Sequence, residues 1–253
     1  MQNISAIGFD LFNTLITIEP EALEDALGRL WQSLSSSGLH LQRDGFLQAH
    51  REAALEHILS ARQTGLETHN RFWVSQALKS LGHPVEPGDP RIAQAVEDYF
   101  SAFAEHARLI PGTLDLLASL GRRYTLGLLS NFTHPPAARA ILDHTGLSSH
   151  FQALIISGDL GLRKPHPGSF SALTRAMGVA PEQMLYIGDN PEADVDGASQ
   201  AGIRPVWMTY VRDNELAFAP GVSPEQKESP LVQSLRISDW SGLEKLVDSG
   251  LKH

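Results

Sequence analysis

The segment ISAIGFDLFNTL, residues 4–15, starts with an apolar run and becomes turn-prone and polar at Asp10. The apolar run Ile4–Phe9 has the length of a single buried strand. A strand of this kind, followed at once by a polar loop, is typical of the centre of a parallel sheet, where both faces are covered. The segment therefore predicts an α/β fold in which Asp10 stands at the carboxyl end of a buried strand.

Downstream of Ile110-Pro111-Gly112, helical and strand patterns alternate along the chain. The spacing of apolar residues predicts helices at 114–120, 137–145, 170–177, 193–201 and 240–247, and strands at 124–129, 153–157, 184–187 and 205–210. Strands that alternate with helices predict a doubly wound parallel sheet. The segment Arg212–Pro230 is rich in Pro, Glu and Ser, which predicts an irregular, mobile loop.

The stretch from Glu21 to Tyr99 has a different pattern, with four apolar stripes at helical spacing and almost no strand-like alternation. The stripes lie at 23–31, 46–53, 72–81 and 92–100. This pattern predicts an all-helical domain at 18–107, inserted into an α/β core domain formed by 1–17 and 108–253.

The composition is that of an ordinary globular protein, with 42% hydrophobic and 19% charged residues and a net charge of −9. The lack of a basic run argues against nucleic acid or an anionic membrane as the main partner. The chain has no cysteine, which excludes disulfides and thiolate catalysis. No signal-peptide pattern and no apolar stretch of ~20 residues is present, so we expect a cytoplasmic protein. Monomer and homodimer both remain open.

Four chemically active side chains follow predicted strands. Asp10, Ser130 and Asp189 come directly at strand ends, and Lys164 lies on a loop after the strand that ends at Ser157. In an open α/β sheet, ligands bind outside the carboxyl ends of the strands, so these side chains are expected to converge. A nucleophilic carboxylate, a hydroxyl donor, a cation and a second carboxylate are the groups that phosphoryl transfer needs.

Four segments together resemble the motifs of the haloacid dehalogenase-like superfamily. They occur in the family's order: FDLFNTL at 9–15, LLSNF at 128–132, GLRKPHP at 161–167 and IGDNPEADVDGA at 187–198. Each motif alone would be weak, but four in the right order are specific. The resemblance implies a Rossmann-like core. The predicted helical insertion falls where one subfamily carries a helical cap, between the first and second motifs.

The resemblance also implies a role for individual residues. The leading aspartate of the first motif attacks the substrate in this family, which makes Asp10 the expected nucleophile. Ser130 would bind the transferred group, and Lys164 would neutralise its charge. Asp194 would be an acidic companion that positions Lys164 or a bound water.

A magnesium ion is the cofactor that the resemblance implies. Its expected ligands are the carboxylates of Asp10 and Asp189 and the backbone carbonyl of Phe12. Two hard carboxylates with open positions for water and phosphate suit Mg²⁺. Asn131 and Thr14 would contact the anionic small-molecule substrate.

Phe12 departs from the family's pattern, because most phosphatases of the family carry a second aspartate there. That aspartate protonates the leaving alcohol and then activates water, and such catalysis typically contributes about 10²–10⁴-fold. Three functions therefore remain open. The first is a magnesium-dependent phosphatase that is slow, or selective for phosphates that leave without a proton. The second is a metal-free 2-haloacid dehalogenase, and the third is a catalytically weak binding or regulatory protein.

Other positions divide these alternatives. A departing halide needs no general acid, and the family's dehalogenases carry tyrosine at this position and a Ser-Asn pair in the second motif, as residues 130–131 do here. They carry serine, however, at the position of Asp189. The carboxylates of Asp10, Asp189 and Asp194 would form a negative cluster that one lysine balances poorly and a divalent cation balances well. We therefore expect a magnesium-dependent hydrolase of a small phosphorylated metabolite that works through an aspartyl-phosphate.

Overall fold

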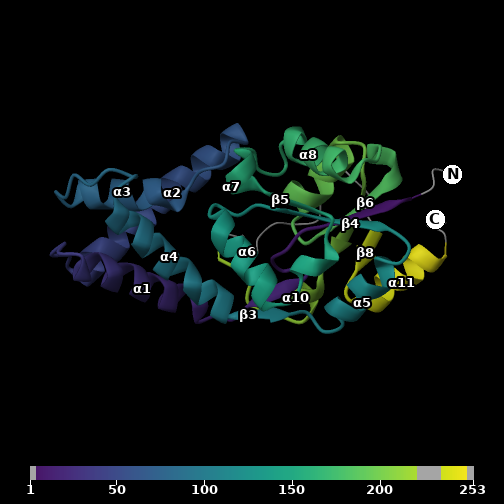
Figure 1. Ribbon diagram of the computed structural model, residues 1–253, viewed down its shortest axis with the longest axis horizontal. Coiled ribbons are helices and arrows are strands. Elements are labelled where there is room, and N and C mark those ends of the chain that lie inside the picture. The colour runs from purple at the N-terminus through teal and green to yellow at the C-terminus, as the bar shows by residue number, and fades with distance from the viewer. Residues whose placement is uncertain (1–3, 221–234, 250–253) are drawn as a thin grey trace.

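The computed structural model describes residues 4–220 and 235–249. A six-stranded sheet forms its centre, in the order β5-β4-β1-β6-β7-β8, and every strand pairing in it is parallel (Figure 1). The strands are β1 Ala6–Phe9, β4 Thr125–Ser130, β5 Ala153–Ile156, β6 Met184–Gly188, β7 Arg204–Met208 and β8 Leu235–Ile237. The predicted α/β class with a doubly wound parallel sheet is confirmed.

The helices of the α/β core connect these strands. They are α5 Thr113–Leu120, α6 Pro135–His144, α7 Ser157–Leu160, α8 Pro167–Met177, α9 Gly197–Gln200, α10 Tyr210–Asp213 and α11 Trp240–Asp248. A π-helical segment, Pro191–Asp196, precedes α9. In Figure 1, α8 lies above the sheet, whereas α5 and α11 lie below it.

Strand β1 shows that both faces of the sheet are covered. Gly8 and Phe9 are neighbours in β1, so they face opposite sides of the sheet. The Phe9 ring lies 6.3 Å from the Trp240 ring of α11. On the other face, a Cβ added to Gly8 would lie 2.9 Å from a methyl carbon of Leu173 in α8. Glycine at this position therefore allows α8 to pack closely against the central strand.

The four apolar stripes of the N-terminal half coincide with four helices. These are α1 Ala22–Ser36, α2 Arg43–Thr64, α3 Asn70–Ser80 and α4 Pro90–Glu105. Gly65 ends α2 in the left-handed conformation, at φ 70°. Asp89 caps α4 by accepting a hydrogen bond from the Arg91 amide, and Pro90 begins the helix. Figure 1 shows these helices gathered beside the sheet rather than over one of its faces.

Two short strands at the ends of the helical segment were not predicted. β2, Ile16–Ile18, pairs antiparallel with β3, Ala107–Leu109. Three residues are too few to give a recognisable alternation, which explains why the sequence pattern missed them. The predicted domain boundaries, 17/18 and 107/108, fall inside this pair, and the division into two domains stays a prediction.

The C-terminal part differs from the sequence prediction in two places. The strand predicted at 205–210 ends at Met208, because Tyr210 begins α10. Arg212 lies in the same helix, so the predicted irregular loop does not begin there. The rest of that prediction falls partly on residues 221–230, which lie outside the described residues. β8, which joins the sheet edge, was not predicted.

Within residues 4–220 and 235–249, no helix has both the length and the apolar character needed to cross a lipid bilayer.

His50 generates a prediction about acid stability. This residue of α2 is 4% exposed, its ring lies 6.0 Å from that of Phe46 and 6.2 Å from that of Tyr99, and its Nε2 has no hydrogen-bond partner among the described residues. Burial lowers the pKa of His50 to about 4. Because the folded-state pKa lies below the unfolded value of about 6.5, the stabilisation is present above pH 6.5 and is lost as the pH falls towards 4.

Replacing this histidine should therefore reduce the acid sensitivity of the fold. Between pH 7 and pH 4, His50→Leu should lose roughly 3 kcal/mol less of its unfolding free energy than the wild type does. Urea denaturation at several pH values measures this difference. His40→Leu is the control, since His40 is exposed. Equal acid sensitivity of wild type and His50→Leu would contradict the burial argument.

Candidate active site

The parallel sheet brings the predicted site residues to one edge. Asp10 follows β1, Ser130 ends β4 and Asp189 follows β6, and β1 lies between the other two strands. Lys164 reaches them from the loop after α7. All are buried, as is Asp194 of the π-helical segment. The convergence that the strand-end pattern predicted is thus present in the structure.

The Lys164 ammonium lies at the centre of this group. Its Nζ donates to Oδ1 of Asp10 at 2.6 Å, to Oδ1 of Asp194 at 2.6 Å and to the hydroxyl of Tyr186 at 2.8 Å. Three donors thus meet three acceptors, which is the full capacity of an ammonium group. Burial disfavours the charged lysine, but the two carboxylates outweigh it and raise the pKa of Lys164.

Three carboxylates crowd around this single lysine. Oxygen atoms of Asp10, Asp189 and Asp194 lie within 4.8 Å of one another. Burial, opposed by Lys164 and reinforced by Asp194, raises the pKa of Asp10 to about 6. Burial together with Asp10 and Asp194 also raises the pKa of Asp189 well above its usual range. The single positive charge of Lys164 is therefore too little to balance the three carboxylates.

A divalent cation fits this cluster chemically. Three ionised carboxylates against one ammonium leave a charge of −2, which Mg²⁺ would neutralise with the oxygen ligands it prefers. Of the three carboxylates, Asp194 has both oxygens in short hydrogen bonds within the protein. Its Oδ1 accepts from Lys164, and its Oδ2 accepts from the Asn190 amide at 2.9 Å. Asp10 and Asp189 are the better candidates for ligands.

Asp189 is held by residues that the sequence pattern did not single out. Its Oδ2 accepts a hydrogen bond from Nδ2 of Asn13 at 3.1 Å, and its carbonyl accepts from the Trp207 indole at 2.9 Å. Asn13 has a positive φ of 59°, a conformation that asparagine tolerates better than most residues. Its position inside the turn-prone LFNTL segment was the available signal.

Ser130 offers a hydroxyl group with no protein partner. It is 1% exposed, and its Oγ has no hydrogen-bond partner among the described residues. A buried hydroxyl costs free energy when it is unpaired, so this group is suited to an oxygen of a bound ligand. The structure thus gives Ser130 a free donor at the edge of the sheet where the carboxylates meet.

Asn131 and Thr14, the predicted substrate contacts, have partners within the protein. The Asn131 side chain donates to the Lys164 carbonyl at 2.9 Å and accepts from the Lys164 amide at 2.8 Å. The Asn131 side chain therefore fixes the position of the Lys164 loop. Thr14 Oγ1 donates to Oδ2 of Asp10 at 3.4 Å. Substrate binding by either residue stays a prediction.

Phe12 packs against another aromatic side chain. Its ring stacks on that of Phe132, with centroids 5.1 Å apart and planes 19° from parallel. Phe132 in turn lies 5.1 Å from Phe100 of α4, and Phe100 stacks on His134 at 4.9 Å. Phe12, which stands where most phosphatases of the family have the second aspartate, thus belongs to a cluster of aromatic rings between the α/β core and the helical segment.

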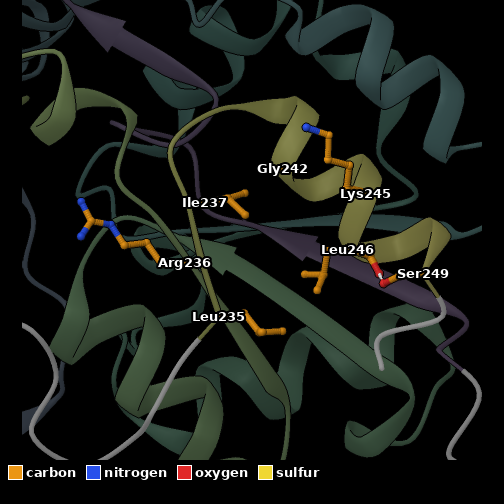
Figure 2. Close-up of a pocket in the computed structure, with 7 residues that line it drawn as sticks. All are labelled: Leu235, Arg236, Ile237, Gly242, Lys245, Leu246 and Ser249. Atoms are coloured by element: carbon orange, nitrogen blue, oxygen red, sulfur yellow. Dashed lines mark hydrogen bonds between the residues drawn. The ribbon is translucent and has the colours of Figure 1, made fainter. Parts of the chain in front are cut away.

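A hollow of about 360 Å³ lies elsewhere, between β8 and α11 (Figure 2). It is lined by Leu235, Arg236, Ile237, Gly242, Lys245, Leu246 and Ser249. None of the converging residues lines this hollow. The candidate site is therefore at the carboxyl ends of β1, β4 and β6 and not in the hollow.

Comparison with known proteins agrees with the fold and with the four motifs. The family model of haloacid dehalogenase-like hydrolases matches residues 4–202, which include all the site residues predicted from the sequence. The chain belongs to this family of hydrolases, and the predicted resemblance is confirmed.

Two of the curated relatives of the chain are named as phosphatases. The chain is 36% identical to phosphoserine phosphatase from Thermus thermophilus over 165 residues, which are 65% of this chain and 59% of that protein. It is 32% identical to phosphoglycolate phosphatase from Rhodospirillum rubrum over 210 residues, 81% of this chain and 79% of that protein. The first of these matches thus spans only about three fifths of the relative.

Solved structures share the fold with lower identity. A phosphatase of the family from Thermococcus onnurineus matches with a TM-score of 0.64 and 23% identity, covering 96% of this chain and 98% of that one. A 2-haloacid dehalogenase from Pseudomonas syringae matches with a TM-score of 0.66 and 22% identity, covering 98% and 99%. At these identities the likeness concerns the fold alone.

Tyr186 is a further residue of the site that sequence reasoning missed, and it generates a prediction. It lies inside the buried strand β6, and its hydroxyl donates to the Leu129 carbonyl at 2.9 Å and accepts from Lys164. Tyr186→Phe removes both hydrogen bonds. We expect the unfolding free energy to fall by about 1–3 kcal/mol in urea denaturation.

Tyr124→Phe is the matched control, because Tyr124 is partly exposed and its hydroxyl accepts only from the exposed Arg123 among the hydrogen bonds of the described residues. Equal losses in the two variants would contradict the importance of the buried Lys164 contact.

Proposed function

We propose that the protein is a magnesium-dependent phosphohydrolase that cleaves a small phosphorylated metabolite through an aspartyl-phosphate on Asp10. The observation that carries the proposal is the buried cluster of Asp10, Asp189 and Asp194 around Lys164, because its excess negative charge suits a divalent cation and a bound phosphoryl group. The names of the curated relatives, phosphoserine and phosphoglycolate phosphatase, support a small phosphorylated substrate.

The two oxygens of Asp10 are suited to different tasks. Among the side-chain hydrogen bonds of the described residues, Oδ1 accepts from Lys164 at 2.6 Å, whereas Oδ2 accepts from Thr14 at the long distance of 3.4 Å. Oδ2 is therefore the freer nucleophile. Its attack forms a bond to phosphorus and breaks the bond from phosphorus to the leaving oxygen, which departs with the electron pair. Water then cleaves the aspartyl-phosphate, which releases phosphate and restores the carboxylate.

The surrounding groups stabilise the phosphoryl group during this reaction. The unpaired Ser130 hydroxyl and the backbone amide of Asn131 would donate to its oxygens, and the Lys164 ammonium would offset its charge. Held by Asp10, Asp189 and the Phe12 carbonyl, Mg²⁺ would supply further positive charge next to the phosphoryl oxygens.

Phe12 limits the leaving groups that this site handles well. A phenyl ring can neither protonate a leaving alcohol nor activate water. Substrates whose leaving group departs without a proton, such as acyl phosphates, should therefore react faster than alkyl phosphates.

A second candidate is a 2-haloacid dehalogenase, and Phe12 is the observation that favours it, because a departing halide needs no proton. In that reaction Oδ2 of Asp10 would attack carbon instead of phosphorus. Asp189 argues against it, since a second buried carboxylate beside the nucleophile would repel a substrate that itself carries a carboxylate.

Phosphate release from acetyl phosphate and from an aryl phosphate tests the proposal. We expect release with millimolar Mg²⁺, its loss with chelator, and background rates in Asp10→Asn, because the amide is a poor nucleophile. Asp44→Asn, on the exposed surface of α2, should keep the wild-type rate. Independently of activity, Mg²⁺ should raise the melting temperature of the wild type more than that of Asp189→Asn.

The opposite results have equally clear meanings. Release that survives in Asp10→Asn would remove Asp10 as the nucleophile. No phosphate release, together with chloride release from 2-chloropropionate without metal, would replace the phosphohydrolase by the dehalogenase.

Phe12→Asp tests the missing acid directly. Restoring a carboxyl group should raise the turnover of an alkyl phosphate by about tenfold or more relative to Phe12→Asn. The asparagine variant is the matched control, because both substitutions remove the ring that stacks on Phe132 and only one supplies a proton. Equal rates in the two variants would show that the lack of an acid does not limit the reaction.

A further inference from the structure

The segment that joins α2 to α3 contacts the loop that carries Lys164. The amide of Glu67 donates to the Gly161 carbonyl at 2.9 Å, and the amide of Arg163 donates to the Gly65 carbonyl at 3.0 Å. Leu66 and Leu162 form an antiparallel bridge between these two bonds. Figure 1 shows α2 ending beside α7, where this loop begins. The helical segment is thus attached by backbone hydrogen bonds one residue away from Lys164.

The Glu67 side chain is buried at this contact. It is only 2% exposed, its Oε2 accepts from the hydroxyl of Ser157 at 2.5 Å, and its Oε1 lies 3.5 Å from a guanidinium nitrogen of Arg163. Burying a carboxylate costs free energy unless hydrogen bonds and opposite charge compensate. The Thr68 amide also donates to Oε1, at 2.9 Å. These contacts fix the position of Glu67, which in turn fixes Ser157 and Arg163.

Ser157 connects Glu67 to the loop that follows β4. Its Oγ accepts from the Phe132 amide at 2.8 Å while it donates to Glu67. The Phe132 carbonyl, at 3.4 Å, is a much poorer acceptor for the same hydroxyl. Phe132 is two residues from Ser130, so an unbroken chain of hydrogen bonds runs from Glu67 to the Ser130 loop.

The Glu67 carboxylate is thus connected to both loops that supply phosphate-binding groups. Through Ser157 it holds the loop of Ser130, and through Arg163 it holds the loop of Lys164. The Asn131 side chain already joins these loops by two hydrogen bonds to the Lys164 backbone. Glu67 therefore braces the same pair of loops from the side of the helical segment.

We propose that Glu67 is a positioning residue of the active site, which sets the relative placement of Ser130 and Lys164 when the helical segment is docked. The proposal rests on the phosphohydrolase function proposed above. Nothing in the sequence around Glu67 indicates this role, because it lies outside the four motifs and follows a helix end.

Substitution of Glu67 should affect turnover more than binding. In Glu67→Ala, the Ser157 hydroxyl loses its short contact and Arg163 loses its partner, so kcat should fall about 10- to 100-fold with a smaller change in KM. Glu67→Gln keeps an oxygen that accepts from Ser157 and should recover most of the loss. Ser157→Ala should resemble Glu67→Ala, and the double variant should be no worse than either.

Hydrogen–deuterium exchange gives a readout that does not depend on activity. Peptides that cover 131–134 and 157–164 should exchange faster in Glu67→Ala than in the wild type. Glu56→Ala is the matched control, because Glu56 is an exposed glutamate of α2 that accepts from Gln76, and it should change neither exchange nor kcat.

The outcomes separate this proposal from the proposed function. Unchanged exchange and unchanged kcat in Glu67→Ala, in an active wild type, would overturn the positioning role alone, as would additive losses in the double variant. A wild type that releases no phosphate would instead overturn the phosphohydrolase. In that case, faster exchange in Glu67→Ala would still support the bracing of the two loops, and unchanged exchange would refute it.

Discussion

The hydrogen bonds of the Lys164 ammonium are the contacts on which the site depends. Asp10 follows the central strand, Asp194 lies in a π-helical segment and Tyr186 is inside a strand, yet all three bond the same nitrogen at 2.6–2.8 Å. A buried ammonium is stable only when its donors are paired and its charge is balanced. Charge balance at the site is therefore inseparable from the packing of the core that brings these elements together.

The same burial explains why the site suits an anion together with a cation. The low-dielectric surroundings that strengthen the Lys164 contacts also raise the pKa of Asp10 and Asp189, so the carboxylates are costly to ionise without further positive charge. At the same strand ends, the Ser130 hydroxyl is buried without a hydrogen-bond partner among residues 4–220 and 235–249. The excess negative charge would be balanced by a bound cation, and the Ser130 hydroxyl would find an acceptor in a bound anion. Both features therefore mean that ligand binding lowers the free energy of the site.

The helical segment is joined to this site by two kinds of contact. Phe12, Phe132 and Phe100 form an aromatic cluster, whereas Glu67 accepts a directional hydrogen bond from Ser157. Packed rings tolerate small displacements, but a buried carboxylate does not. The polar contact is therefore the one suited to transmit the position of the helices to the catalytic loops.

Local patterns were sufficient for β1, β4, β5, β6 and β7, for most helices and for the strand-end positions of Asp10, Ser130 and Asp189, because apolar periodicity and strand ends depend on neighbouring residues. The three-residue strands β2, β3 and β8 were too short for such a pattern. The sequence alone thus determined the α/β class, the family and the chemical groups of the site. Only the tertiary structure decided their partners. Asn13 meets Asp189 across 176 positions, and Glu67 meets Ser157 across 90. Contacts between such distant residues depend on how helices pack against the sheet, which no local spacing specifies.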